Sequence, residues 1–105
     1  MMLLTKANRA ALPKIGAQDG KGLDAIAYVK LFHPTSRYTF YVTEFDGDDL
    51  LFGYVVSPLG PDCDELGYSS LSELAALRAG PFNLGIERNL HFSPQSINDA
   101  IRSGA

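Results

Sequence analysis

Three segments in the first half of the chain carry the apolar and aromatic residues typical of β-strands. Residues 26–33 alternate aliphatic with aromatic side chains, residues 37–45 are rich in Tyr, Thr, Val and Phe, and residues 50–57 are β-branched and aromatic. Only three or four residues separate consecutive segments. Such short links join antiparallel neighbours, because a parallel crossover takes about a dozen residues or more. The pattern therefore predicts an antiparallel three-stranded meander, with residues 65–69 as a fourth strand.

Alternate positions along these segments do not divide into one apolar and one polar face. In the second segment Tyr38, Phe40 and Val42 share one face, but the opposite face carries Tyr41 and Phe45. A sheet with one face in water alternates apolar and polar residues strictly. We therefore expect the second face to be covered by helices, by another subunit or by a ligand.

The clearest helix signals surround residues 70–79. Ser70 and Glu73 form a capping-box pattern, in which the Ser70 hydroxyl accepts from the Glu73 amide and the Glu73 side chain bonds back. Apolar residues follow at helical spacing, and Gly80 and Pro81 are typical of the residues just after a helix.

Two further helices are expected near the ends of the chain. Thr5 is a suitable N-cap for a helix over 5–12, and Ser93 with Pro94 favours a helix over 94–103. The glycine-rich segment 15–23 looks like a flexible connection. Together these elements predict a single α+β domain over residues 1–105, with an antiparallel meander flanked by helices.

Length and composition support one ordinary globular domain. The 105 residues are 46% hydrophobic and 20% charged, which is typical of a folded domain. No apolar run approaches the roughly 20 residues that span a membrane, and Met1-Met2-Leu3-Leu4 is too short for the apolar region of a signal peptide. Cys63 is the single cysteine and lies among acids, so no intrachain disulfide forms and a reactive thiolate is disfavoured. We expect a cytoplasmic protein.

The net charge of −3 is unevenly distributed. Residues 1–37 carry six Lys or Arg against two Asp, whereas residues 38–105 carry three Arg against ten acids. Nucleic-acid binding depends on clustered Lys and Arg, and here the basic residues are scattered singly. Aromatic side chains on the predicted strands could still stack unpaired bases, so single-stranded nucleic acid is kept as an alternative ligand. An acidic mimic of DNA is a weaker alternative, because its carboxylates would need a longer and denser array.

The most varied polar chemistry lies in residues 87–92. If this segment is extended, Glu87 and His91 share a face and could supply a general base with an orienting carboxylate, although alternate residues lie about 7 Å apart. Arg88 adds a guanidinium, and Tyr68 precedes a helix start whose amides favour an anion. We predict that at least two of these four side chains share one concavity, as a candidate ligand or anion site. The competing interpretation is that the segment supplies core and surface residues only.

Other kinds of site lack their usual patterns. His33, His91 and Cys63 have no metal-binding spacing, and the acidic segment 46–49 fits a hairpin turn better than a calcium loop. No phosphate-binding glycine motif or nucleophile elbow is present. We therefore expect no metal and no cofactor, and we assign no catalytic residue.

The chain resembles the DUF2958 family along nearly its whole length. The stretches that carry this resemblance are Leu3-Leu4-Thr5-Lys6, Val29-Lys30-Leu31-Phe32, Glu65-Leu66-Gly67-Tyr68, Ser70-Leu71-Ser72-Glu73-Leu74 and Ile86-Glu87-Arg88-Asn89-Leu90-His91-Phe92. The resemblance implies a small bacterial protein, often encoded near plasmid and conjugative-element functions. It assigns no activity and no functional residue.

The function expected from these observations is that of a non-enzymatic binding or accessory module. A protein partner or a homo-oligomer is favoured by the two-sided apolar sheet and by the absence of a catalytic motif. Single-stranded nucleic-acid binding through the sheet aromatics is one alternative, and a small-ligand or enzymatic site around Glu87, Arg88 and His91 is another.

Overall fold

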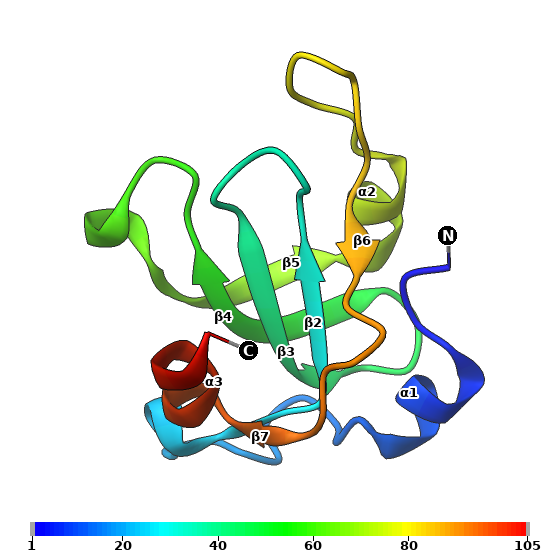
Figure 1. Cartoon of the computed structure of the whole chain (residues 1–105). Coiled ribbons are helices and arrows are strands. Elements are labelled where there is room, and N and C mark those ends of the chain that lie inside the picture. The colour runs from blue at the N-terminus through cyan, green and yellow to red at the C-terminus, as the bar shows by residue number, and fades with distance from the viewer. Residues whose placement is uncertain (1, 105) are drawn as a thin grey trace.

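The computed structural model describes residues 2–104 and has an α+β fold built around one antiparallel sheet (Figure 1). Its five strands lie in the order β5-β4-β3-β2-β6. They are β2 (Val29–Phe32), β3 (Thr39–Phe45), β4 (Leu50–Val56), β5 (Glu65–Ser70) and β6 (Glu87–Arg88). The predicted meander and its fourth strand are confirmed, and β6 is added at the other edge.

Short helices and a second, smaller sheet surround the main sheet. The helices are α1 (Lys6–Ala11), α2 (Leu71–Ala76) and α3 (Ile97–Ser103), with the 3-10 turns η1 (Gly22–Asp24) and η2 (Pro61–Cys63). The small sheet pairs β1 (Ile26–Ala27) with β7 (Gln95–Ser96). Among the described residues, no helix has the length and hydrophobicity that a membrane crossing requires.

The side chains of the sheet build two cores, one on each face. The first core lies towards α2 and the N-terminal segment and contains Leu4, Leu12, Val29, Leu31, Phe40, Val42, Leu51, Leu71, Leu74 and Ile86. The second core lies towards α3 and contains Ala25, Ala27, Tyr41, Ile97 and Ala100. Helix α3 therefore covers part of the second face, as one of the three sequence-based alternatives expected.

The predicted strand 26–33 is divided at Tyr28. Ala27 belongs to the second core, whereas Val29 belongs to the first. A regular strand would put both residues on the same face, because they are two apart. The interruption at Tyr28 therefore lets one segment serve both cores.

A β-bulge in β3 places an acid on the second face. The pairing of β3 with β4 shifts between Val42 and Glu44, so that Glu44 lies opposite Phe52 and Phe45 lies opposite Leu51. A bulge inserts one extra residue and thereby reverses the alternation of side chains beyond it. Phe45 consequently returns to the first core, and the Glu44 carboxylate lies buried under the preceding loop.

That loop, residues 15–23, was predicted to be a flexible connection, and the structure corrects this interpretation. The two Glu44 carboxylate oxygens accept hydrogen bonds from the amides of Gly16 (2.7 Å) and Gln18 (2.8 Å). The buried Gln18 side chain in turn exchanges hydrogen bonds with the backbone of Ile26 and donates to the Thr43 carbonyl. Partners more than 20 residues away in the sequence thus hold the loop in place.

The predicted N-caps at Thr5 and Ser70 are confirmed, but two helix boundaries differ from the prediction. The Ser70 hydroxyl accepts from the Glu73 amide (3.2 Å) and itself donates to Asp49 (2.5 Å). Helix α2 ends at Ala76, and Gly80 instead takes its positive φ of 81° in the turn that follows.

The last helix also begins later than predicted. Its N-cap is Ser96, whose hydroxyl accepts from the Asp99 amide (3.1 Å). Gln95 and Ser96 are drawn into the pairing with β1, so Pro94 lies outside the helix.

Replacing Glu44 tests whether the buried carboxylate organises the loop. Glu44→Ala should lower the free energy of unfolding by roughly 2–3 kcal/mol, because two amides lose their acceptor and each unsatisfied buried group costs about 1–3 kcal/mol. Asp48→Ala, which removes an exposed acid from the next turn, should change it by no more than about 0.5 kcal/mol. Denaturant titration measures both, and equal effects of the two substitutions would contradict this assignment.

Candidate functional site

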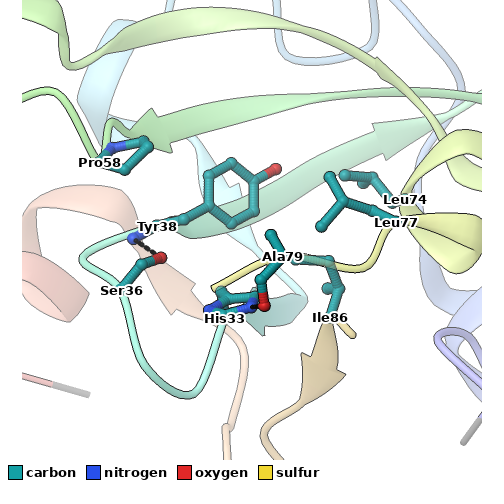
Figure 2. A pocket seen from close by; sticks show the side chains of 8 residues that line it. All are labelled: His33, Ser36, Tyr38, Pro58, Leu74, Leu77, Ala79 and Ile86. Atoms are coloured by element: carbon teal, nitrogen blue, oxygen red, sulfur yellow. Dashed lines mark hydrogen bonds between the residues drawn. The ribbon is translucent and has the colours of Figure 1, made fainter. Parts of the chain in front are cut away.

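An apolar cavity of about 180 Å³ lies at one end of the sheet and opens to the surface. The β2–β3 loop, the β4–β5 loop and the hairpin that follows α2 all project towards this end (Figure 1). The lining residues come from all three segments and from α2. They are His33, Ser36, Tyr38, Pro58, Leu74, Leu77, Ala79 and Ile86 (Figure 2).

His33 fixes the hairpin to the β2–β3 loop. Its buried imidazole places Nε2 at 3.1 Å from the carbonyl oxygens of both Ala79 and Leu84, and the Thr35 amide donates to Nδ1 at 3.3 Å. Because Nδ1 accepts, the proton lies on Nε2 and is shared between the two carbonyls. The ring is therefore fully engaged in structure, and neither nitrogen is free to act as a catalytic base.

An ion pair connects the β2–β3 and β4–β5 loops. The Arg37 guanidinium binds both oxygens of Asp64 at 2.7 Å and also donates to the Ser57 carbonyl at 2.6 Å. The Ser57 amide donates to the same Asp64 carboxylate (2.7 Å). The guanidinium and the amide hold the pKa of Asp64 below its ordinary value. Together with the His33 contacts, these bonds fix the three loops relative to one another, so the cavity is preformed.

The Tyr38 ring forms one wall of the cavity and points towards Leu74 and Leu77 (Figure 2). Burial raises the pKa of the Tyr38 phenol to about 12, partly offset by a hydrogen bond with the Ser69 side chain. This wall therefore stays uncharged even in alkaline solution at which an exposed tyrosine ionises.

The structure does not bring the four predicted site residues together. Tyr68 lies on β5 and Glu87 and Arg88 lie on β6, at opposite edges of the five-stranded sheet. Three strands separate these edges, a distance of roughly 19 Å at about 4.8 Å per strand. Glu87 lines one surface cavity and Arg88 another, and neither includes Tyr68 or His91.

Glu87 and His91 would share a face only if residues 87–92 were extended, and the chain instead turns after Arg88. Only Glu87 and Arg88 are in a strand, and the Asn89 side chain accepts from the His91 amide (2.9 Å), which bends the chain. The Arg88 guanidinium donates to the Met2 carbonyl. Glu87, Asn89 and His91 therefore do not line one surface.

The start of α2 is also unsuited to an external anion. The Asp49 carboxylate accepts from the Ser72 amide (2.7 Å), and the Ser70 hydroxyl accepts from the Glu73 amide. The protein's own carboxylate thus occupies the position that we expected an anion to take beside Tyr68.

The aromatic side chains of residues 26–57 do not form an open platform. Phe40, Tyr41 and Phe45 are buried, and Tyr28, Phe32, Tyr38, Phe52 and Tyr54 are partly buried. Stacking of unpaired bases requires exposed rings. In the part of the chain that the structure describes, no three His, Cys, Asp or Glu side chains gather as metal ligands do.

No pattern in the sequence predicts this cavity. Its walls come from segments separated by up to about fifty residues, and no spacing pattern links His33 with Ala79 or Leu84. The available signals were indirect. His33 directly precedes Pro34, and apolar residues continue through Leu77 and Ala79 beyond the end of α2.

Titration of the tyrosines tests the buried position of Tyr38. Folding keeps this phenol protonated between pH about 10, where an exposed tyrosine ionises, and pH about 12. The contribution of the protonated Tyr38 phenol to the free energy of unfolding is therefore complete below pH about 10. It is lost as the pH rises through about 12. Tyrosinate absorbance should show a step near pH 12 that shrinks by one tyrosine in Tyr38→Phe. An unchanged step in Tyr38→Phe would contradict the burial of this ring.

Comparison with known proteins places this architecture in one family. Neither the curated proteins nor the solved structures include a match to this chain. The model of a family described as "Protein of unknown function (DUF2958)" matches residues 3–99, which is nearly the whole chain and includes every segment around the cavity. The protein therefore belongs to the DUF2958 family.

Proposed function

We propose that this protein is a non-enzymatic binding module whose cavity takes one apolar side chain of a protein partner. The observation that carries this proposal is the cavity's combination of small size and apolar lining. Its volume of about 180 Å³ lies below the roughly 300–1,000 Å³ of sites for cofactors and drug-sized ligands. It is nevertheless comparable with the cavity of about 150 Å³ that holds benzene in an engineered protein. A leucine or phenylalanine side chain is therefore the occupant that fits.

The surroundings of the cavity support a protein partner. Leu59 follows Pro58 at the rim and is 84% exposed, and Phe82 at the tip of the hairpin is 75% exposed. Leu77, in the wall itself, is also partly exposed. Exposed apolar side chains around a pocket are typical of protein–protein contacts, in which one buried residue contributes much of the binding energy.

The polar groups near the cavity support binding over catalysis. His33 uses both ring nitrogens in structural hydrogen bonds, and Arg37 and Asp64 neutralise each other. Neither His33 nor the Arg37–Asp64 ion pair therefore supplies a free base or nucleophile that faces the cavity. The family resemblance implies an accessory role near plasmid and conjugative functions, and we include that role in the proposal.

Selection from a displayed peptide library tests the cavity directly. Peptides that bind the folded protein should share an apolar residue at one position. Leu77→Asp should weaken their binding by about 10- to 100-fold, because burying such a side chain contributes about 1.5–3 kcal/mol. Leu90→Asp, which changes an exposed leucine outside the cavity, should leave binding unchanged. Failure to enrich any peptide, or equal effects of the two substitutions, would overturn the proposal.

A further inference from the structure

The outer edge of β5 differs from the other edge of the sheet in being long and uncovered. Strand β6, at the opposite edge, has two residues, whereas β5 has six and contains neither proline nor lysine. Proteins commonly protect exposed edges by keeping them short or by placing Lys or Pro on them. Strand β5 is the last strand of the sheet, and Figure 1 shows it running directly into α2. Strand β5 has none of these protections.

The register of β5 shows which backbone groups face outwards. The Leu71 amide donates to the Asp49 carbonyl (2.8 Å), which makes residues 49 and 71 a hydrogen-bonded pair. Such pairs alternate along an antiparallel ladder, so Ser69, Gly67 and Glu65 bond to β4. The amides and carbonyls of Leu66 and Tyr68 therefore point away from the sheet. None of the described residues bonds to these outward groups.

The side chains at the same edge leave an apolar surface on the second face. Leu66 is 37% exposed and Tyr68 is 61% exposed. The Tyr68 ring packs on Phe52 with the ring centroids 4.8 Å apart, which holds it over the sheet. The second core beside α3 reaches as far as Tyr54, the β4 partner of Leu66, and leaves Leu66 and Tyr68 partly exposed beyond it.

The fold of a single copy does not require glycine at position 67. Gly53, its partner on β4, is obligatory because a Cβ there would lie 2.0 Å from the Tyr41 carbonyl oxygen. A Cβ on Gly67 would meet no atom within 4 Å, and its φ lies outside the positive range that favours glycine. Glycine within a strand weakens it and often marks the close approach of another backbone.

We infer that β5 pairs antiparallel with β5 of a second copy of this chain, around a two-fold axis at Gly67. In this register Leu66 of each copy lies opposite Tyr68 of the other copy. Each of these two symmetry-related pairs exchanges two backbone hydrogen bonds. The two Gly67 residues then meet as a non-hydrogen-bonded pair, in which Cα atoms approach to about 4.5 Å. The five strands of each copy join into one continuous sheet.

The second copy fits this edge better than a strand of unrelated sequence because the edge is self-complementary. Residues 66–70 carry no charge, and Glu65 lies opposite Ser69 of the second copy, away from its own symmetry mate. Each Leu66 side chain packs against a Tyr68 ring on the same face, a cross-strand pair of the apolar–aromatic kind that stabilises sheets. This contact is separate from the cavity described above.

Sedimentation velocity over a concentration series tests the dimer. The wild-type protein should sediment increasingly as a dimer as concentration rises. Leu66→Lys should weaken the dimer about tenfold or more, because it places a charge in the paired edge. Ile101→Lys, which alters a similarly exposed residue on α3, should leave the dimer intact. A wild-type protein that stays monomeric at every concentration overturns the inference, as does equal weakening by both variants.

Cysteine cross-linking tests the register. In a Cys63→Ser background, Gly67→Cys should form a disulfide-linked dimer under mild oxidation, because Cα atoms about 4.5 Å apart suit a disulfide. Ser69→Cys should not cross-link, because its symmetry mate lies about four residues, or roughly 13 Å, further along the strand. Circular dichroism confirms that each variant is folded. Cross-linking through Ser69→Cys in place of Gly67→Cys overturns the register.

Discussion

The sheet of this protein is apolar on both faces, and the chain must cover both with helices of only six or seven residues. Helices this short bury little area, so loops complete the cover. A loop packed against a core contains backbone groups that need partners. The structure provides them from side chains of the sheet and its connections. Glu44 and Gln18 hold the loop before β1, His33 holds the hairpin after α2, and Asp49 holds the start of α2.

These polar contacts also explain why a small domain has a preformed cavity. The loops around it are fixed to one another chiefly by the bonds of His33, which itself lines the cavity, and by the Arg37–Asp64 pair outside it. Both ring nitrogens of His33 are already bonded to the backbone, and the rest of the lining is mainly apolar. A partner that binds there meets loops already in place, so little conformational entropy is lost on binding.

The sequence was sufficient to predict the features that depend on near neighbours. The strands of the meander follow from residues adjacent in the chain, and the N-caps at Thr5 and Ser70 depend on residues three positions away. Contacts between distant residues could not be predicted in this way. Glu44 lies 26 residues from Gln18, and His33 lies 46 residues from Ala79. The bulge at Thr43 and the break at Tyr28 likewise follow from tertiary packing, which outweighs local alternation. The turn at Asn89 was predictable, because asparagine commonly accepts from the amide two residues on.

The hairpin after α2 separates the residues that hold it from the residues that it displays. His33 bonds to backbone carbonyls at the base of the hairpin, and backbone atoms are the same whatever side chains the tip carries. Substitutions at Pro81 and Phe82 therefore leave these bonds in place. The identity of the tip residues is thereby uncoupled from the bonds that position the hairpin, as in binding loops carried on a rigid framework.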